Sequence, residues 1–137
     1  MNHRKLQNML ISHEGFSRLA YKCTAGATTV GYGRNLDSLG VTKCEATFLL
    51  DNDIRRCTAD LLSIFPDQFE SFPENIQMVL IDMRFQMGYR GFRKFKKMIA
   101  AVKVQDWPEM IIQMKDSRWY RQVPGRAEDL IQMIEVL

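Results

Sequence analysis

A carboxylate, a thiol and a hydroxyl follow one another at short intervals near the N-terminus. Glu14 is followed by eight residues and then Cys23, and a further five residues separate Cys23 from Thr29. A carboxylic acid can donate a proton to a leaving oxygen, a thiolate can carry negative charge, and a hydroxyl can hold a water molecule. The stretch is therefore either a catalytic loop or a turn-rich hairpin that happens to contain a cysteine.

The elements around these residues can be predicted from local patterns. Residues 3–13 are expected to form a helix, because Leu6, Met9 and Leu10 share one face and Gly15 can end it. Glu14 then lies at the helix C-terminus, where the helix dipole disfavours its negative charge. A general acid must keep its proton near neutral pH, so this position suits that role. The alternating TTVGYG segment, preceded by a TAGA turn, predicts a short hairpin within residues 17–34.

From Thr42 onward the sequence reads as helical. Thr42-Lys43-Cys44-Glu45 is a capping-box pattern that opens a helix of about 20 residues. Residues 71–74 and 106–109 show similar capping patterns, and Pro124 begins the last helix. The apolar face of the long helix is expected to be buried, and it comprises Ala46, Leu49, Leu50, Ile54, Cys57, Leu61 and Leu62.

These elements predict one α+β domain, mainly α, over residues 1–137. The expected parts are a small α+β lobe at 14–41, a connecting helix at 42–63 and a helical lobe at 64–137. Residues 1–13 are expected to pack on the helical lobe. A cleft between two lobes is a common place for an active site.

Composition excludes several classes of protein. The 137 residues carry 19 Lys and Arg against 16 Asp and Glu, a formal charge of +3 that only mildly favours an anionic polymer. The three cysteines form no CxxC pair, so a zinc or redox motif is not indicated and a reduced, cytoplasmic state is expected. No apolar run approaches the ~18 residues of a membrane span, and the N-terminus is too polar for a signal peptide.

Three separated blocks resemble the lysozymes of tailed bacteriophages, glycoside hydrolase family 24. The first contains Glu14-Gly15, Tyr21-Lys22, Cys23, Thr29 and Gly31-Tyr32-Gly33. The others are Phe85-Gln86-Met87-Gly88, and Ser117-Arg118-Trp119-Tyr120 followed by Pro124-x-Arg126-Ala127. The sequence departs from the family in having Cys23 where Asp is commoner, and in a very short stretch between Arg34 and Val41.

The resemblance assigns roles to single residues. Glu14 would be the general acid, Cys23 and Thr29 would assist the attacking water, and Arg126 would orient Glu14. The residues implied in saccharide binding are Asn35, Phe85, Gln86, Met98, Gln113 and Arg118. Several of these residues have an alternative interpretation. Glu14 would be a solvated residue at a helix end, Arg126 an ordinary basic residue, Cys23 a space-filling residue and Thr29 an ordinary strand residue. Phe85 and Met98 would be core residues, and Arg118 a surface ion-pair partner.

The resemblance implies an endolysin that hydrolyses the β-1,4 bond between N-acetylmuramic acid and N-acetylglucosamine in peptidoglycan. It implies no metal or cofactor, no nucleic-acid partner, no stable membrane anchor and a monomer. The enzyme would wait in the host cytoplasm until a separate membrane-permeabilising protein acts. The alternatives are a catalytically weak peptidoglycan-binding module of the same fold and an enzyme that forms an anhydro product without water. A nucleic-acid binder is disfavoured, because no arginine-rich or aromatic-interleaved stretch occurs.

Overall fold

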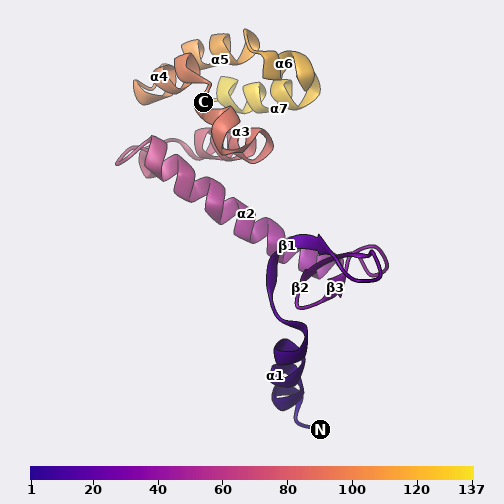
Figure 1. Ribbon diagram of the computed structural model, residues 1–137. Helices are drawn as coiled ribbons and strands as arrows, with labels where there is room; N and C mark the ends of the chain where they lie inside the picture. Colours follow the sequence, from indigo (N-terminus) through magenta and orange to yellow (C-terminus); the bar gives the residue numbers. More distant parts are fainter. The chain divides into compact units, whose positions relative to one another are not determined.

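The computed structural model describes residues 1–137 and is mainly helical, with one small sheet (Figure 1). The elements are α1 (His3–Glu14), β1 (Ser17–Lys22), β2 (Thr28–Gly31), β3 (Arg34–Asn35), α2 (Lys43–Ile64), the 3-10 helix η1 (Phe69–Ser71), α3 (Glu74–Arg93), α4 (Lys96–Lys103), α5 (Trp107–Lys115), α6 (Arg118–Gln122) and α7 (Pro124–Glu135). The predicted α+β, mainly α fold is confirmed. None of the helices combines the length with the apolar composition that a membrane span requires.

The chain divides into two compact units, Met1–Phe48 and Leu49–Leu137, and each is described by itself. The first unit holds α1 and a three-stranded antiparallel sheet in the order β1-β2-β3. The predicted hairpin is β1 and β2, while the two-residue β3 extends it by one strand. Thr29 is the single buried residue of this unit, at 4% exposure. The small unit therefore encloses a hydroxyl rather than an apolar core.

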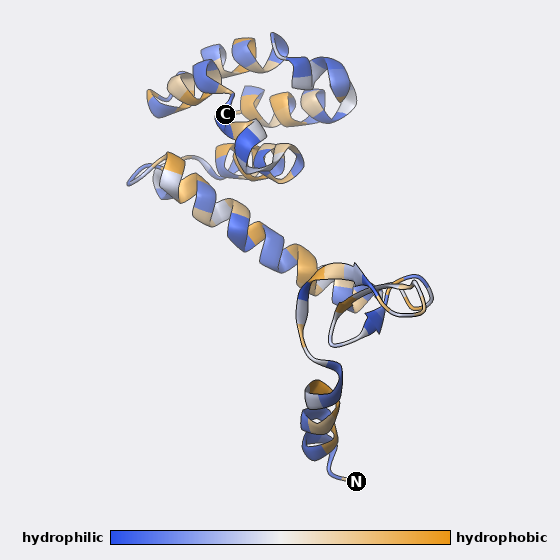
Figure 2. Ribbon diagram, in the orientation of Figure 1, coloured by the Kyte–Doolittle hydropathy of each residue, from blue (hydrophilic) through white to orange (hydrophobic).

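The second unit holds the hydrophobic core. Figure 2 shows apolar and polar residues alternating along its helices. Helices α3 and α7 pack together, as do α4 and α5. The largest fully buried side chains include Phe65, Phe92, Leu61, Ile76 and Leu80. Burial of such side chains contributes roughly 1.5–3 kcal/mol each before the entropy cost of ordering them.

Two local predictions were wrong. Ser71 does not cap α3, because its hydroxyl donates to the Gln68 carbonyl and Pro73 is the N-cap residue. The apolar face of α2 is buried only in its C-terminal half, which contributes Cys57, Leu61 and Ile64 to the interior. The apolar residues earlier on that face, such as Leu49 and Leu50, are exposed. Spacing alone predicts which residues share a face and does not tell whether anything covers it.

Helix α3 is broken once, at Gly88. This residue has φ 76° and ψ 172°, which is not helical, so residues 74–87 and 89–93 are two helical segments. Glycine adopts a positive φ without the steric penalty of other residues. The interruption at Gly88 redirects the chain just after Phe85 and Gln86.

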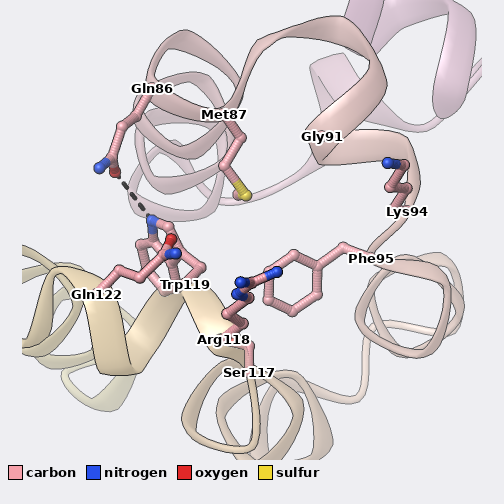
Figure 3. Close-up of a pocket in the computed structure, with 9 residues that line it drawn as sticks. All are labelled: Gln86, Met87, Gly91, Lys94, Phe95, Ser117, Arg118, Trp119 and Gln122. Atoms are coloured by element: carbon pink, nitrogen blue, oxygen red, sulfur yellow. Dashed lines mark hydrogen bonds between the residues drawn. The ribbon is translucent and has the colours of Figure 1, made fainter.

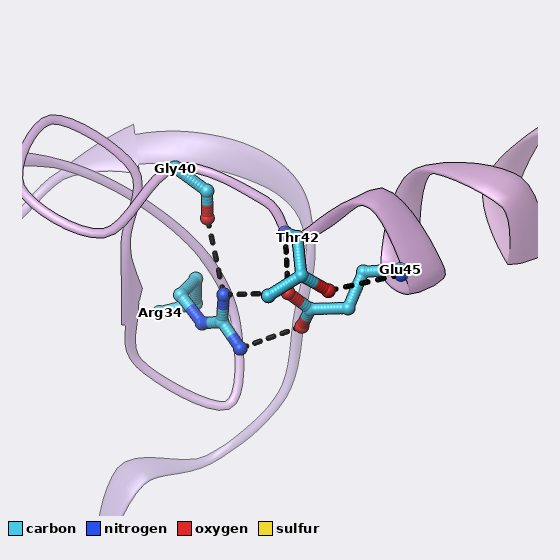
Figure 4. Close-up of polar contacts among 4 residues, drawn as sticks. All are labelled: Arg34, Gly40, Thr42 and Glu45. Carbon is cyan, nitrogen blue, oxygen red and sulfur yellow. Dashed lines mark hydrogen bonds and ion pairs between the residues drawn. The ribbon is translucent and has the colours of Figure 1, made fainter.

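The predicted capping box at Thr42 is present and has an additional partner (Figure 4). The Thr42 backbone N–H donates to Glu45 Oε1 at 2.8 Å, and the Glu45 N–H donates to the Thr42 hydroxyl at 3.1 Å. Arg34 of β3 adds a two-point contact, with its two terminal nitrogens 3.1 and 2.6 Å from the Glu45 oxygens. The same guanidinium donates to the Gly40 carbonyl at 3.0 Å. Arg34 therefore ties the end of the sheet to the first turn of α2.

We expect this contact to make stability depend on acidic pH. The Arg34 guanidinium, helped by the backbone N–H and hydroxyl of Thr42, lowers the pKa of Glu45 to about 2. An unfolded glutamate titrates at about 4.3, so the contact stabilises the fold fully above that pH and is lost as the pH falls toward 2. Thermal unfolding followed from pH 7 to pH 2 should show that Glu45→Gln lowers the melting temperature at pH 7.

The difference between Glu45→Gln and the natural chain should vanish near pH 2. Glu70→Gln, which changes an exposed glutamate with no ion pair, is the matched control and should follow the natural chain. A constant difference at every pH would contradict the assigned cause, because it would not follow the titration of Glu45.

Candidate active site

The carboxyl group of Glu14 lies against Gly33. Glu14 is the last residue of α1, and the Gly15 N–H closes the helix by donating to the Ile11 carbonyl at 2.9 Å. A Cβ built on Gly33 would stand 2.8 Å from Glu14 Oε2 and 3.2 Å from Glu14 Cδ. Gly33 also has φ 77°, in the left-handed region. The carboxyl is therefore held over the turn that follows β2, with its side chain exposed.

Cys23 begins the turn that joins β1 to β2. Its N–H donates to the Ala27 carbonyl at 3.0 Å, and its carbonyl accepts from the Gly26 N–H at 2.8 Å. The side chain is half-buried, whereas Cys44 is exposed and Cys57 is buried. Cys23 therefore occupies a closed polar turn.

The turn favours the thiolate form of Cys23. Hydrogen bonds from the backbone of Ala27 and Ala25 lower the pKa of the Cys23 thiol, with a smaller contribution from the Thr29 hydroxyl, and partial burial opposes them. Burial raises the pKa of the Cys57 thiol. Of these two thiols, the one in the turn is the better placed to carry charge near neutral pH.

Thr29 lies in the middle of the sheet, and its hydroxyl is enclosed. The hydroxyl donates to the Ala27 carbonyl at 2.9 Å, so it faces the same turn as Cys23. Thr28, its neighbour in β2, instead accepts a hydrogen bond from Lys22 Nζ at 2.6 Å. The strand thus sends its two threonines to different partners, as alternation predicts.

Asn35 is the residue of β3 directly opposite Thr29. Residues opposite each other in an antiparallel pair project from the same face of the sheet. Asn35 Oδ1 accepts from the Ser38 N–H at 3.1 Å, which fixes its side chain. Cys23, Thr29 and Asn35 therefore lie near one another on the sheet and its first turn, and Glu14 lies against Gly33 in the same unit.

In the helical unit, Arg126 pairs with Asp82. Arg126 Nε lies 2.7 Å from Asp82 Oδ1, and both side chains are a little over one-third exposed. Arg126 is in the first turn of α7, and Asp82 is in α3. Asp82 precedes Phe85 and Gln86 by three and four residues, so these three residues share one side of α3. Sequence reasoning did not identify Asp82.

Gln86 and Arg118 line a pocket of about 470 Å³ in the helical unit (Figure 3). Gln86 Oε1 accepts from the Trp119 indole N–H at 2.9 Å. The Trp119 ring is buried and meets the Phe95 ring edge-on, with the centroids 6.3 Å apart. Lys94 and Gln122 add polar groups to the lining. An apolar wall with a few fixed polar groups is typical of a ligand site.

The other residues predicted to bind saccharide lie outside this pocket. Phe85 is 43% exposed and lines a smaller recess beside Arg84 and Cys57. Gln113 is half-buried and donates to Glu109 Oε1 at 2.8 Å. Met98 is fully buried in the core, as its alternative interpretation as a core residue describes. Its side chain offers no exposed surface to a ligand.

Sequence reasoning gave Gly33 and Trp119 no separate roles, although both stand in the quoted motifs. Gly33 makes room for the Glu14 carboxyl, and the Trp119 indole fixes the Gln86 amide. Their roles could have been suspected from the sequence, because this glycine and this tryptophan both lie within the blocks that resemble the family.

Comparison with known proteins agrees with the sequence motifs. The family described as phage lysozyme matches residues 11–131. The chain is 26% identical to probable T4-type lysozyme 2 of Dictyostelium discoideum, over 95% of this chain and 93% of that protein. It is 27% identical to probable T4-type lysozyme 1 of the same organism over the same shares.

A third relative is matched over part of its length. The chain is 34% identical to the pre-baseplate central spike protein Gp5 of Enterobacteria phage T4, over 69% of this chain and 17% of that protein. The match to the family profile covers most of the chain and includes Glu14, Cys23, Thr29 and Arg126. This chain therefore belongs to the phage lysozyme family and is a glycoside hydrolase of the muramidase type.

Proposed function

We propose that the chain is an endolysin that cleaves the β-1,4 bond between N-acetylmuramic acid and N-acetylglucosamine and so lyses the host cell wall. The observation that carries the proposal is the placement of the Glu14 carboxyl over Gly33, in the same unit as Cys23 and Thr29. The similarity to two T4-type lysozymes over nearly their whole length supports it.

In the proposed reaction, Glu14 donates its proton to the glycosidic oxygen, and the bond from that oxygen to C1 breaks. Positive charge develops on the sugar ring, and water attacks C1. The Cys23 thiolate supplies negative charge close to that centre, and the Thr29 hydroxyl positions the water. The water that has bonded to C1 releases its extra proton to solvent, and Glu14, left as a carboxylate, takes up a proton from solvent.

Arg126 is proposed to orient Glu14. A guanidinium has five N–H donors, and the pair with Asp82 uses the one on Nε. The terminal amino groups are therefore left to hold a second carboxylate. Asp82 would restrict the motion of the guanidinium while it does so.

For the saccharide, we propose contacts with Asn35 on the sheet and with Gln86 and Arg118 at the pocket of the helical unit. The Trp119 hydrogen bond holds the Gln86 side chain in one orientation, which lowers the entropy cost of binding a sugar. Phe85 and Gln113 are proposed to contact the saccharide as well. The enzyme is proposed to act as a monomer, reaching the wall from the host cytoplasm after a separate protein permeabilises the membrane.

Replacement of Glu14 by glutamine should abolish wall hydrolysis, because an amide cannot donate the required proton. General acid catalysis contributes ~100- to 10,000-fold, and a loss of that size is expected. The measurement is muropeptide release from purified peptidoglycan, with product masses to distinguish hydrolysis from anhydro-sugar formation. Glu135→Gln is the matched control, since Glu135 is the exposed last residue of α7. Near-normal release by the Glu14 variant would refute the proposed acid.

Cys23→Asp should keep activity and Cys23→Ser should lose most of it, because a carboxylate replaces the negative charge of the thiolate and a neutral hydroxyl does not. Activity of the natural chain should rise with pH through the lowered pKa of Cys23, as the thiolate fraction grows. Cys23→Asp should lack this rise, because its carboxylate is already ionised. Rates of muropeptide release from neutral to mildly alkaline pH test both expectations.

A bulky thiol reagent provides the control for Cys23. It should inactivate the natural chain and Cys44→Ser, and leave Cys23→Asp unaffected. Full activity in both Cys23→Ser and Cys23→Ala would mean that the thiol merely fills space beside Thr29.

A further inference from the structure

Positive charge is concentrated in one part of the helical unit. Residues 83–105 contain seven of the 19 Lys and Arg and none of the 16 Asp and Glu. The rest of the chain therefore has more acidic than basic residues. The basic stretch covers the second half of α3 and all of α4, up to Asp106. A surface region that carries charge of a single sign attracts ligands of the opposite charge.

A pocket of about 460 Å³ opens on this stretch. Three cationic side chains line it, Arg93 from the end of α3 and Lys96 and Lys103 from α4, together with Ser63 from the end of α2. No acidic and no aromatic residue contributes to the lining. Lys96 and Lys103 are seven residues apart, so they share a face of α4 with a rise of about 10 Å between them.

Arg93 is held rigidly at the edge of this pocket. Its terminal nitrogen lies 2.8 Å from Asp60 Oδ1, while Arg84 Nε lies 2.6 Å from Oδ2 of the same buried carboxylate. One negative charge is thus shared by two guanidinium groups, which leaves a net positive charge. The Arg93 guanidinium also stacks 4.1 Å from the centre of the Tyr89 ring. Its Nε is buried without a hydrogen-bond partner.

The two lysines have no anionic partner. Neither Lys96 nor Lys103 takes part in any of the four ion pairs of the structure. The main chain of Lys103 is fixed, because its carbonyl accepts from the Gln68 amide at 3.0 Å. A solvated helix face would be the ordinary explanation for a few lysines. A solvated face does not explain why three cationic side chains line one recess, with Arg93 among them fixed by its ion pair with Asp60.

We infer that this pocket binds the phosphate groups of an anionic phosphodiester polymer attached to the bacterial wall, and so holds the enzyme on its substrate. The inference rests on the proposed function, because a wall-bound polymer lies beside the bond to be cleaved. The recess and the paired lysines suit successive phosphates of a flexible chain. A nucleic acid is disfavoured, because the pocket offers no aromatic side chain on which bases could stack.

The test compares Lys96→Gln/Lys103→Gln with Lys97→Gln/Lys115→Gln. Both double variants remove two exposed lysines, and only the first changes the pocket. Sedimentation with walls that retain or lack their phosphodiester polymer measures binding, in the Glu14→Gln background so that the walls stay intact. The parent and the control should bind polymer-bearing walls more tightly than stripped walls. The pocket variant should lose that preference. In a plot of the logarithm of its wall-binding constant against the logarithm of the salt concentration, the slope should be smaller in magnitude by about 2 than that of the parent.

Glycerol phosphate is the small probe of the same site. Its addition should shift the backbone amide resonances of residues 93–103 in the parent and the control, and leave those of the pocket variant unchanged. Equal losses in both double variants would overturn the inference, because the effect would then be one of net charge. Equal binding to intact and stripped walls, or tighter binding to anionic vesicles or DNA, would also overturn it.

Activity on stripped walls separates this inference from the proposed function. With Glu14 intact, Lys96→Gln/Lys103→Gln should release muropeptides from stripped walls at the parent rate. An absence of release by the parent itself would refute the proposed function. Normal release combined with unselective wall binding would refute only the phosphate site.

Discussion

The small unit depends on the absence of a side chain at residue 33. A Cβ there would lie 2.8 Å from Glu14 Oε2, closer than two such atoms can approach without displacement. The positive φ of Gly33 makes the same demand for a different reason, since glycine alone adopts it without strain. A side chain at residue 33 would therefore be strained by this φ and would push the flexible Glu14 carboxyl away from the turn. The turn after β2 thus leaves room for the Glu14 carboxyl.

Backbone hydrogen bonds in the turn after β1 explain how a cysteine can occupy the position where family members more often have aspartate. The turn of residues 23–27 directs hydrogen bonds of Ala27 and Ala25 toward the Cys23 side chain. Such groups stabilise an anion whatever atom carries the charge, so they favour a thiolate as they would favour a carboxylate. A cysteine in an apolar setting behaves in the opposite way, as the raised pKa of Cys57 illustrates. The environment thus assigns different properties to identical side chains.

Features set by neighbouring residues could be predicted from the sequence, and features set by distant residues could not. The capping box at Thr42 and the N-cap hydrogen bond at Asp106 formed, because a hydroxyl or carboxylate needs only to reach an N–H three residues away. The similar pattern at Ser71 failed, because its hydroxyl found a closer carbonyl. The Arg126–Asp82 pair and the Trp119–Gln86 bond join residues 44 and 33 apart, and no spacing rule specifies such partners. The resemblance could nominate Arg126 and Gln86, while the structure alone supplies what each one touches.

The Arg126–Asp82 pair bears on how an arginine can assist a general acid. An isolated guanidinium beside such an acid would favour its ionised form, which has no proton to donate. Asp82 compensates the charge of Arg126 through Nε at 2.7 Å, so the pair as a whole is neutral. The remaining N–H groups of Arg126 keep their direction and can still orient a carboxyl by hydrogen bonding. In the proposed role of Arg126, the arginine would supply geometry while Asp82 limits its electrostatic effect, and a proton-donating glutamate requires that combination.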